Sequence, residues 1–132
     1  KRAPMPLVRI DLAKGTSAQF RKTLGDIVYK AMIDIIDVPK DDKFQIITEH
    51  PPEELNYAPS YLGIEHSSGL VLIQVTMSVG RTVQAKQAFY KEIAEQLHAQ
   101  LGIRKEDVFI NLVETARENW SFGNGIAQYV TA

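Results

Sequence analysis

The stretch PLVRIDLAKGTSAQF (residues 6–20) and the stretch VLIQVTMSVGRTVQA (residues 71–85) are two versions of one pattern. At a spacing of 65 residues, Pro6–Glu49 aligns with Val71–Glu114 without a gap. Seven of the 44 aligned pairs are identical, and ten more exchange similar residues. Each half runs from an apolar stretch through a glycine-containing turn and a helical stretch to a second apolar stretch. We therefore predict one domain, residues 6–132, that contains two internal repeats, 6–49 and 71–114.

The pattern within each half predicts a strand, a helix and a second strand. Leu7–Leu12 alternates apolar and polar residues, as a half-buried strand does. Ser17 is the expected N-cap of a helix with apolar residues at helical spacing, and Val38-Pro39 ends that helix. The remaining expected elements are a strand at Phe44–Thr48, a strand at Leu70–Met77, a helix at Thr82–Leu101 ended by Gly102, and a strand at Val108–Glu114.

Two such units in tandem predict an α+β fold, a four-stranded mixed sheet with two helices on one face. The strand at Leu70–Val75 is apolar on both faces, so we expect its second face to be covered by another copy of the chain. Between the halves, His50–Ser68 is a proline-containing loop with a short strand near residues 63–65. The tail at 119–125 is rich in turn residues, and 126–130 could add a small strand.

Composition excludes several classes of protein. The net charge is −1 and the basic residues are scattered, so we expect neither a nucleic-acid nor a membrane partner. The chain has no cysteine, and His50, His66 and His98 lack metal-ligand spacing, so we predict no metal and no cofactor. No apolar run approaches the roughly 20 residues of a membrane span, which favours a cytoplasmic protein. Residues 1–5 lie outside the repeat and are predicted to be a leader or a remnant of expression, with Met5 the natural start.

Several local motifs carry a family resemblance. They are Met5-Pro6-Leu7, Val38-Pro39 followed by Asp42–Gln45, Ser67-Ser68, Arg81-Thr82 with Lys86, Phe89–Lys91, Val113-Glu114 and Asn119–Gly123. With these motifs the chain resembles the tautomerase superfamily, in particular its malonate semialdehyde decarboxylase branch. The resemblance implies a homotrimer whose sheets face a central axis. It also implies a catalytic amino-terminal proline, which is exposed when the initiator methionine is removed.

The resemblance assigns roles to individual residues. Pro6, once amino-terminal, is a secondary amine that can act as general acid or base. Arg81 has the fixed charge and planar fork that suit a substrate carboxylate, and its counterpart in the first half is Thr16. Asp42 would assist the proline by directing water or tuning charge. Trp120 and Phe122 would form an apolar wall.

Each of these residues also has a purely structural interpretation. Pro6 could simply start a strand, and Arg81 could be a solvated surface residue. Asp42 could cap a turn, because Asp107 occupies the same place in the second half. Trp120 and Phe122 could equally be trimer contacts.

The chain departs from the decarboxylase pattern at one point. That pattern has two arginines after the third strand, whereas this chain has only Arg81, and the place of the first falls near Ser78 or Val79. One cation polarises a carbonyl less well, so we expect keto–enol tautomerisation of a small 2-oxo acid, with Ser78 among the substrate-binding residues. The alternatives are a malonate semialdehyde-type decarboxylase or hydratase, and a non-catalytic ferredoxin-like binding module.

Overall fold

The structure is a computed structural model that describes residues 6–130. The predicted leader, residues 1–5, lies outside the described residues. The first half contains strand β1 (Leu7–Ala13), helix α1 (Ala18–Ile36) and strand β2 (Gln45–His50). Ser17 is the N-cap of α1, as predicted, because its Oγ accepts a hydrogen bond from the Phe20 N–H at 3.0 Å. Helix α1 ends at Asp37, which adopts a left-handed conformation with φ of 57°.

The second half contains the corresponding elements. Strand β5 (Val71–Ser78) leads to helix α2 (Val83–Leu101), and strand β6 (Val108–Thr115) follows. Thr82 caps α2 through a bond from the Ala85 N–H to its Oγ1. Gly102 ends the helix with φ of 69°, as the sequence predicts for a residue that needs left-handed backbone.

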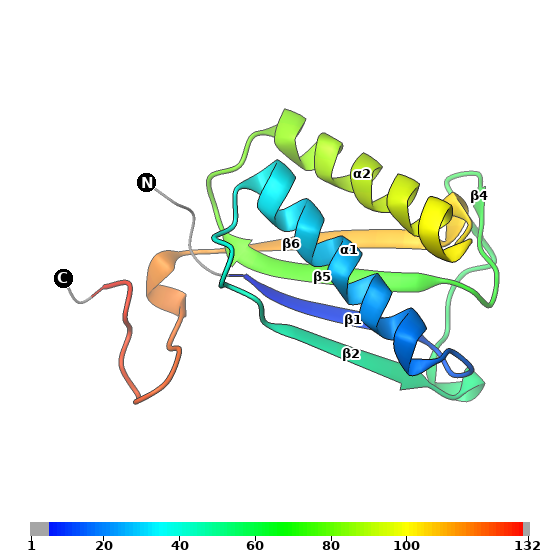
Figure 1. Cartoon of the computed structure of the whole chain (residues 1–132), viewed down its shortest axis with the longest axis horizontal. Coiled ribbons are helices and arrows are strands. Elements are labelled where there is room, and N and C mark those ends of the chain that lie inside the picture. Colours follow the sequence, from blue (N-terminus) through cyan, green and yellow to red (C-terminus); the bar gives the residue numbers. More distant parts are fainter. Residues whose placement is uncertain (1–5, 131–132) are drawn as a thin grey trace.

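The four long strands form one sheet in the order β2-β1-β5-β6. Strands β1 and β2 are parallel, β5 and β6 are parallel, and the central pair β1–β5 is antiparallel. Both helices cover the same face of this sheet (Figure 1). The predicted α+β fold, with a four-stranded mixed sheet and two helices on one face, is confirmed.

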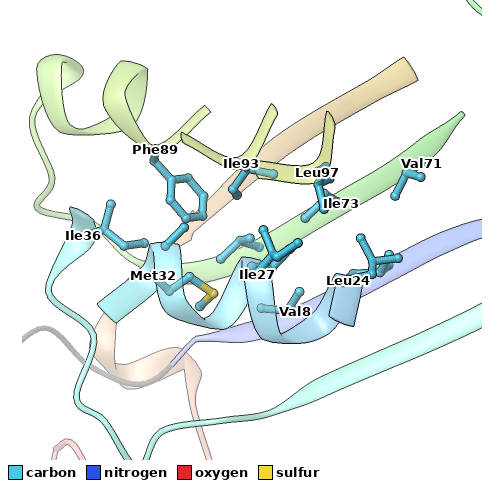
Figure 2. Packing of buried hydrophobic residues seen from close by; sticks show 14 of the residues in the cluster. Val8, Leu24, Ile27, Met32, Ile36, Val71, Ile73, Phe89, Ile93 and Leu97 are labelled. Atoms are coloured by element: carbon cyan, nitrogen blue, oxygen red, sulfur yellow. The ribbon is translucent and has the colours of Figure 1, made fainter. Parts of the chain in front are cut away.

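The core lies between the helices and the sheet. Figure 2 shows Phe89, Ile93 and Leu97 of α2 packed above Ile73 and beside Met32 of α1. All five side chains are buried. The alternation of β1 and β5 provides the floor of this core, because every second residue points towards the helices. The buried face therefore fixes the register of the central strand pair.

The opposite face of the sheet carries exposed apolar side chains. Ile46, Phe109 and Val113 are 41%, 44% and 37% exposed. The register places them on one face, since Arg9 pairs with Ile46, Leu72 with Phe109 and Thr76 with Val113. Neither helix covers these side chains, because both helices lie on the other face of the sheet (Figure 1).

The connections differ in part from the sequence predictions. The loop between the halves contains a 3-10 turn at Pro52–Glu54 and a small hairpin of β3 (Ser60–Tyr61) and β4 (Ile64–Glu65). The strand near residues 63–65 is therefore confirmed. The small strand at 126–130 is wrong, because the backbone turns there and the Val130 N–H bonds to the Ala127 carbonyl at 3.0 Å.

Neither α1 nor α2, the two long helices within residues 6–130, has the apolar length that a bilayer crossing requires. The cytoplasmic location stays a prediction.

Candidate active site

One end of the sheet gathers most of the predicted site residues. There β1 begins, β5 and β6 end, and the C-terminal segment starts (Figure 1). The end of α1 and the start of α2 lie above the same edge (Figure 1). Antiparallel pairing of β1 with β5 accounts for this arrangement, because the first residue of one strand then lies beside the last residues of the other.

Pro6 lies at this end and is buried. Leu7 pairs with Thr76, so the register continued by one residue sets Pro6 opposite Met77 and beside Ser78. On its other side, the Val8 N–H donates to the Phe44 carbonyl at 2.9 Å. Pro6 therefore stands at the start of β1, which runs between β5 and β2.

Arg81 is anchored at the same edge, in the turn between β5 and α2. Its Nε donates to the carbonyl of Ile36 at 3.2 Å, and its Nη1 donates to the carbonyl of Ser78 at 3.1 Å. The two carbonyls come from the ends of α1 and β5, so the guanidinium links both elements. Burial lowers the pKa of Arg81, and the negative charges of Asp37 and Glu114 oppose that shift.

Two buried polar groups at this edge have no hydrogen-bond partner among residues 6–130. They are the Nη2 of Arg81 and the Oγ of Ser78. Ser78 itself is only 2% exposed. Buried polar atoms without partners are rare in folded proteins, because each one loses its bonds to water. These two atoms therefore leave hydrogen-bonding capacity unused at this edge of the sheet.

Asp42 lies in the segment between α1 and β2, and its side chain is half-buried. Its backbone N–H closes a turn with the Pro39 carbonyl at 3.0 Å. Its counterpart Asp107 is only 1% exposed and accepts bonds from the Ser67 N–H and hydroxyl and from Arg104. Asp107 is thus a structural residue, whereas Asp42 has no such set of bonds among the described residues.

An aromatic cluster borders the end of β6. Trp120 donates through Nε1 to the Oγ1 of Thr115 at 2.9 Å and stacks on Phe122 at a centroid distance of 5.4 Å. Phe122 in turn meets the ring of Tyr129 edge-on at 4.9 Å. Thr115 pairs with Ser78 in the sheet register. The bond from Trp120 therefore holds this cluster next to the Ser78 hydroxyl.

Sequence reasoning did not identify two further features of this edge. Thr115 fixes the indole, and Lys86 forms an ion pair with Glu114 at 2.9 Å. The alignment of the two halves contains a signal for this ion pair. It matches Glu49 with Glu114 and Arg21 with Lys86, and so predicts a similar ion pair in each half. The structure contains both pairs, since Arg21 and Glu49 are 3.1 Å apart.

The three histidines are bonded individually and do not form a cluster. The described residues contain no group of histidine, aspartate and glutamate side chains that could hold a metal ion. His50 pairs with Asp11, His66 with the carbonyl of Ala58, and His98 with the carbonyl of Ile103.

These features define a class before any relative is considered. The chain is a double β-α-β protein with an arginine, an aspartate and a strand-starting proline at one edge of its sheet. Two models of the tautomerase enzyme family match it, one over residues 42–123 and the other over residues 6–64.

Relatives with established names cover almost the whole chain. The probable tautomerase YusQ of Bacillus subtilis (strain 168) is 43% identical over 126 residues, which cover 96% of this chain and 99% of YusQ. The probable tautomerase YrdN of the same organism is 37% identical over 127 residues, covering 96% and 98%. Among solved structures, FG41 malonate semialdehyde decarboxylase inhibited by 3-bromopropiolate is 40% identical, with a TM-score of 0.86 over 95% of each chain. Another malonate semialdehyde decarboxylase, described with decarboxylase and hydratase activities, is 36% identical, with a TM-score of 0.85 over 95% of this chain and 96% of that one.

The chain belongs to the tautomerase family, and within the superfamily to the malonate semialdehyde decarboxylase-like branch. The resemblance found in the sequence is therefore confirmed. Family membership favours an enzyme over a non-catalytic binding module.

Proposed function

We propose that the protein catalyses keto–enol tautomerisation of a small 2-oxo acid, with Pro6 as general acid and base. The observation that carries this proposal is the common location of Pro6 and Arg81. Continuing the β1–β5 register by one residue sets Pro6 opposite Met77, the neighbour of Ser78, and the carbonyl of Ser78 accepts a bond from the Arg81 guanidinium. An amine and a cation at one edge of the sheet can engage the reacting carbon and the carboxylate of one small acid.

The chemistry requires the ring nitrogen of Pro6 to be an amine. An amide nitrogen has no basic lone pair, so cleavage after Met5 is a condition of the reaction. A free α-amino group titrates at about 7.7–8.0, and burial favours the neutral form that accepts a proton. The neutral amine removes a proton from the carbon next to the keto group, and the electron pair moves to the keto oxygen. The protonated amine then passes this proton to that oxygen, directly or through a relaying water molecule, which gives the enol and restores the neutral amine.

The other site residues bind and orient the acid. The unpartnered Nη2 of Arg81 donates to the substrate carboxylate, and the Oγ of Ser78 donates to the same group or to the keto oxygen. Asp42 stabilises the protonated amine or directs water. Trp120 and Phe122 supply an apolar wall that excludes bulk water and so strengthens these charged contacts.

Decarboxylation or hydration of a 3-oxo acid is the second candidate. It is supported by the 36–40% identity to the two malonate semialdehyde decarboxylases. The single arginine opposes it, because a neutral hydroxyl at Ser78 stabilises developing negative charge less than a second guanidinium would. The two reactions have different products, so product analysis separates them.

We also propose that the enzyme is a homotrimer. The exposed apolar side chains of Ile46, Phe109 and Val113 form a sheet face that a second copy could bury. Chains of the same fold are described as trimers, among them a fused 4-OT with a TM-score of 0.78 and 21% identity. Sedimentation equilibrium measures the mass of the assembly directly.

The test compares three forms of the protein. One begins at Pro6 after removal of Met5, one carries Pro6→Ala at the same mature start, and one retains residues 1–5. Phenylenolpyruvate and malonate semialdehyde serve as substrates. We expect the first form to turn over phenylenolpyruvate about a hundredfold or more faster than the other two forms. A loss of this size is typical of removing a general base. Equal turnover by all three forms would refute the role of Pro6.

A further inference from the structure

Glu114 and Lys86 form an ion pair at the same edge of the sheet as Arg81. Lys86 Nζ lies 2.9 Å from Glu114 Oε2, and the two side chains are only 24% and 30% exposed. Alternation along β6 puts Glu114 on the strand face that is turned towards the helices. Its carboxylate therefore points towards the first turns of α2. Burial lowers the pKa of Arg81, and the negative charges of Asp37 and then Glu114 oppose that shift, so Glu114 is one of two carboxylates that act on this guanidinium.

The first half of the fold shows what a glutamate at this place can bind. Glu49 aligns with Glu114, and Thr16 aligns with Arg81. Each of these glutamates pairs in the sheet with the equivalent residue of the neighbouring strand, Glu49 with Leu12 and Glu114 with Met77. In the first half, Glu49 accepts bonds from both the backbone N–H and the hydroxyl of Thr16. The residue just before the N-cap therefore lies within bonding reach of the strand glutamate.

Arg81 stands just before the N-cap of the second half, yet its guanidinium does not bond Glu114. It donates to the carbonyls of Ile36 and Ser78, and its Nη2 is left without a partner among the described residues. Glu114 is bonded by Lys86 instead. Without the ammonium of Lys86, the carboxylate of Glu114 would be left free to accept from that arginine, in direct competition with a substrate carboxylate.

We propose that Lys86 is a positioning residue that holds Glu114 against α2 and so keeps the guanidinium of Arg81 open to the carboxylate of the substrate. This inference rests on the proposed function only in the role of Arg81 as the carboxylate-binding group. It makes the Lys86–Glu114 pair a determinant of substrate affinity, although neither residue touches the substrate.

The test measures binding of 3-phenylpropionate, an aromatic carboxylate with no keto group to react. Trp120 is the single tryptophan of the chain and lies at the site, so its fluorescence reports binding without any turnover. We expect Lys86→Met to weaken binding about fivefold, the effect of one partly exposed ion pair. The double variant Lys86→Met/Glu114→Gln should bind within about twofold of the unchanged protein, because the competing carboxylate is gone. Lys86→Arg should also keep the affinity, since Arg21 holds Glu49 in the same way.

The first half provides the matched control. Arg21→Met removes the equivalent cation at the other end of the sheet, and it should leave the affinity for 3-phenylpropionate unchanged. Thermal unfolding of every variant separates loss of the fold from loss of binding. An unchanged affinity in Lys86→Met would refute the proposal, and so would a double variant as weak as the single one. Binding does not need the amine of Pro6, so normal binding without turnover would refute the proposed reaction and leave this inference standing.

Discussion

Replacement of Arg81 by methionine removes the guanidinium proposed to bind the substrate carboxylate and keeps a side chain of similar length. Two hydrogen bonds are lost, together with one proposed contact to the substrate. The carbonyls of Ile36 and Ser78 each lose a donor, at 3.2 and 3.1 Å, and the unpartnered Nη2 disappears. The first two contacts concern the stability of the fold, and the third concerns the bound acid.

The effect on the substrate follows from the worth of a charge-assisted hydrogen bond. Such a bond to a charged group contributes about 1.5–3 kcal/mol. Since about 1.36 kcal/mol corresponds to a factor of ten, kcat/KM should fall about 10- to 150-fold. The free energy of unfolding should fall less, by about 1–2 kcal/mol. The two bonds to carbonyls are lost, but the variant no longer has to bury a charge, which offsets part of the loss.

Ketonisation of phenylenolpyruvate, followed by its ultraviolet absorbance, measures kcat/KM for both proteins. Arg104→Met is the matched control, because Arg104 bonds Asp107 and the Glu65 carbonyl at the other end of the sheet. Chemical denaturation verifies that both variants fold. If Arg81→Met folds and retains the kcat/KM of the unchanged protein, Arg81 does not bind the substrate carboxylate and the proposed site is wrong.

Two further predictions concern stability. Phe89→Ala should lower the free energy of unfolding by about 3–5 kcal/mol, because Phe89 is fully buried between the helices and the sheet; a loss below about 1 kcal/mol in chemical denaturation would contradict this packing. Bonds from the hydroxyl and then the N–H of Thr16, followed by the charge of Arg21, lower the pKa of Glu49 below its ordinary 4.5. The resulting stabilisation is present above about pH 4.5 and disappears as the pH falls through the lower folded-state pKa. Unfolding measured at pH 6 and pH 3 should therefore show a smaller loss of stability on acidification for Glu49→Gln, and equal losses would refute the role of this carboxylate.

The long elements could be predicted because their signals are local. Alternation of side chains defines β1, and the caps at Ser17, Thr82 and Gly102 each depend on a residue and its near neighbours in the chain. The hairpin partner Ser60–Tyr61 was missed, because a two-residue strand has too little alternation to detect.

The predicted strand at 126–130 failed for a tertiary reason. The side-chain amide of Gln128 accepts from the Phe122 N–H at 2.9 Å and donates to the Gly123 carbonyl at 2.8 Å. These bonds close the segment into a loop that β propensity alone does not anticipate.

The features of the site also divide into those that the sequence predicts and those that depend on tertiary packing. The places of Pro6 and Arg81 follow from the alignment of the two halves, because both residues stand at the boundaries of predicted elements. The bond from Trp120 to Thr115 and the charge of Glu114 beside Arg81 could not be predicted, since each depends on how separate elements pack. The sequence therefore indicates the residues of the site better than the interactions that hold them.

The two ends of the sheet explain why only one of them is a candidate for catalysis. We propose that the halves are internal repeats, 6–49 and 71–114, of one domain. At the far end a cavity of about 380 Å³ is lined by Thr16, Val71 and Asp107, the counterparts of Arg81, Pro6 and Asp42. There the aspartate is fully bonded and a hydroxyl replaces the cation.

The two ends differ decisively in whether the first strand residue can carry a free amine. Leu70 precedes Val71 in the middle of the chain, so the nitrogen of Val71 is an amide and cannot accept a proton. The strand that begins with Pro6 is the one that proteolysis or methionine removal can make the first strand of the chain. The repeated β-α-β pattern therefore sets equivalent positions at both ends of the sheet, but an amine at only one of them. At the far end Thr16, in the place of Arg81, bonds Glu49 instead and so stabilises the fold.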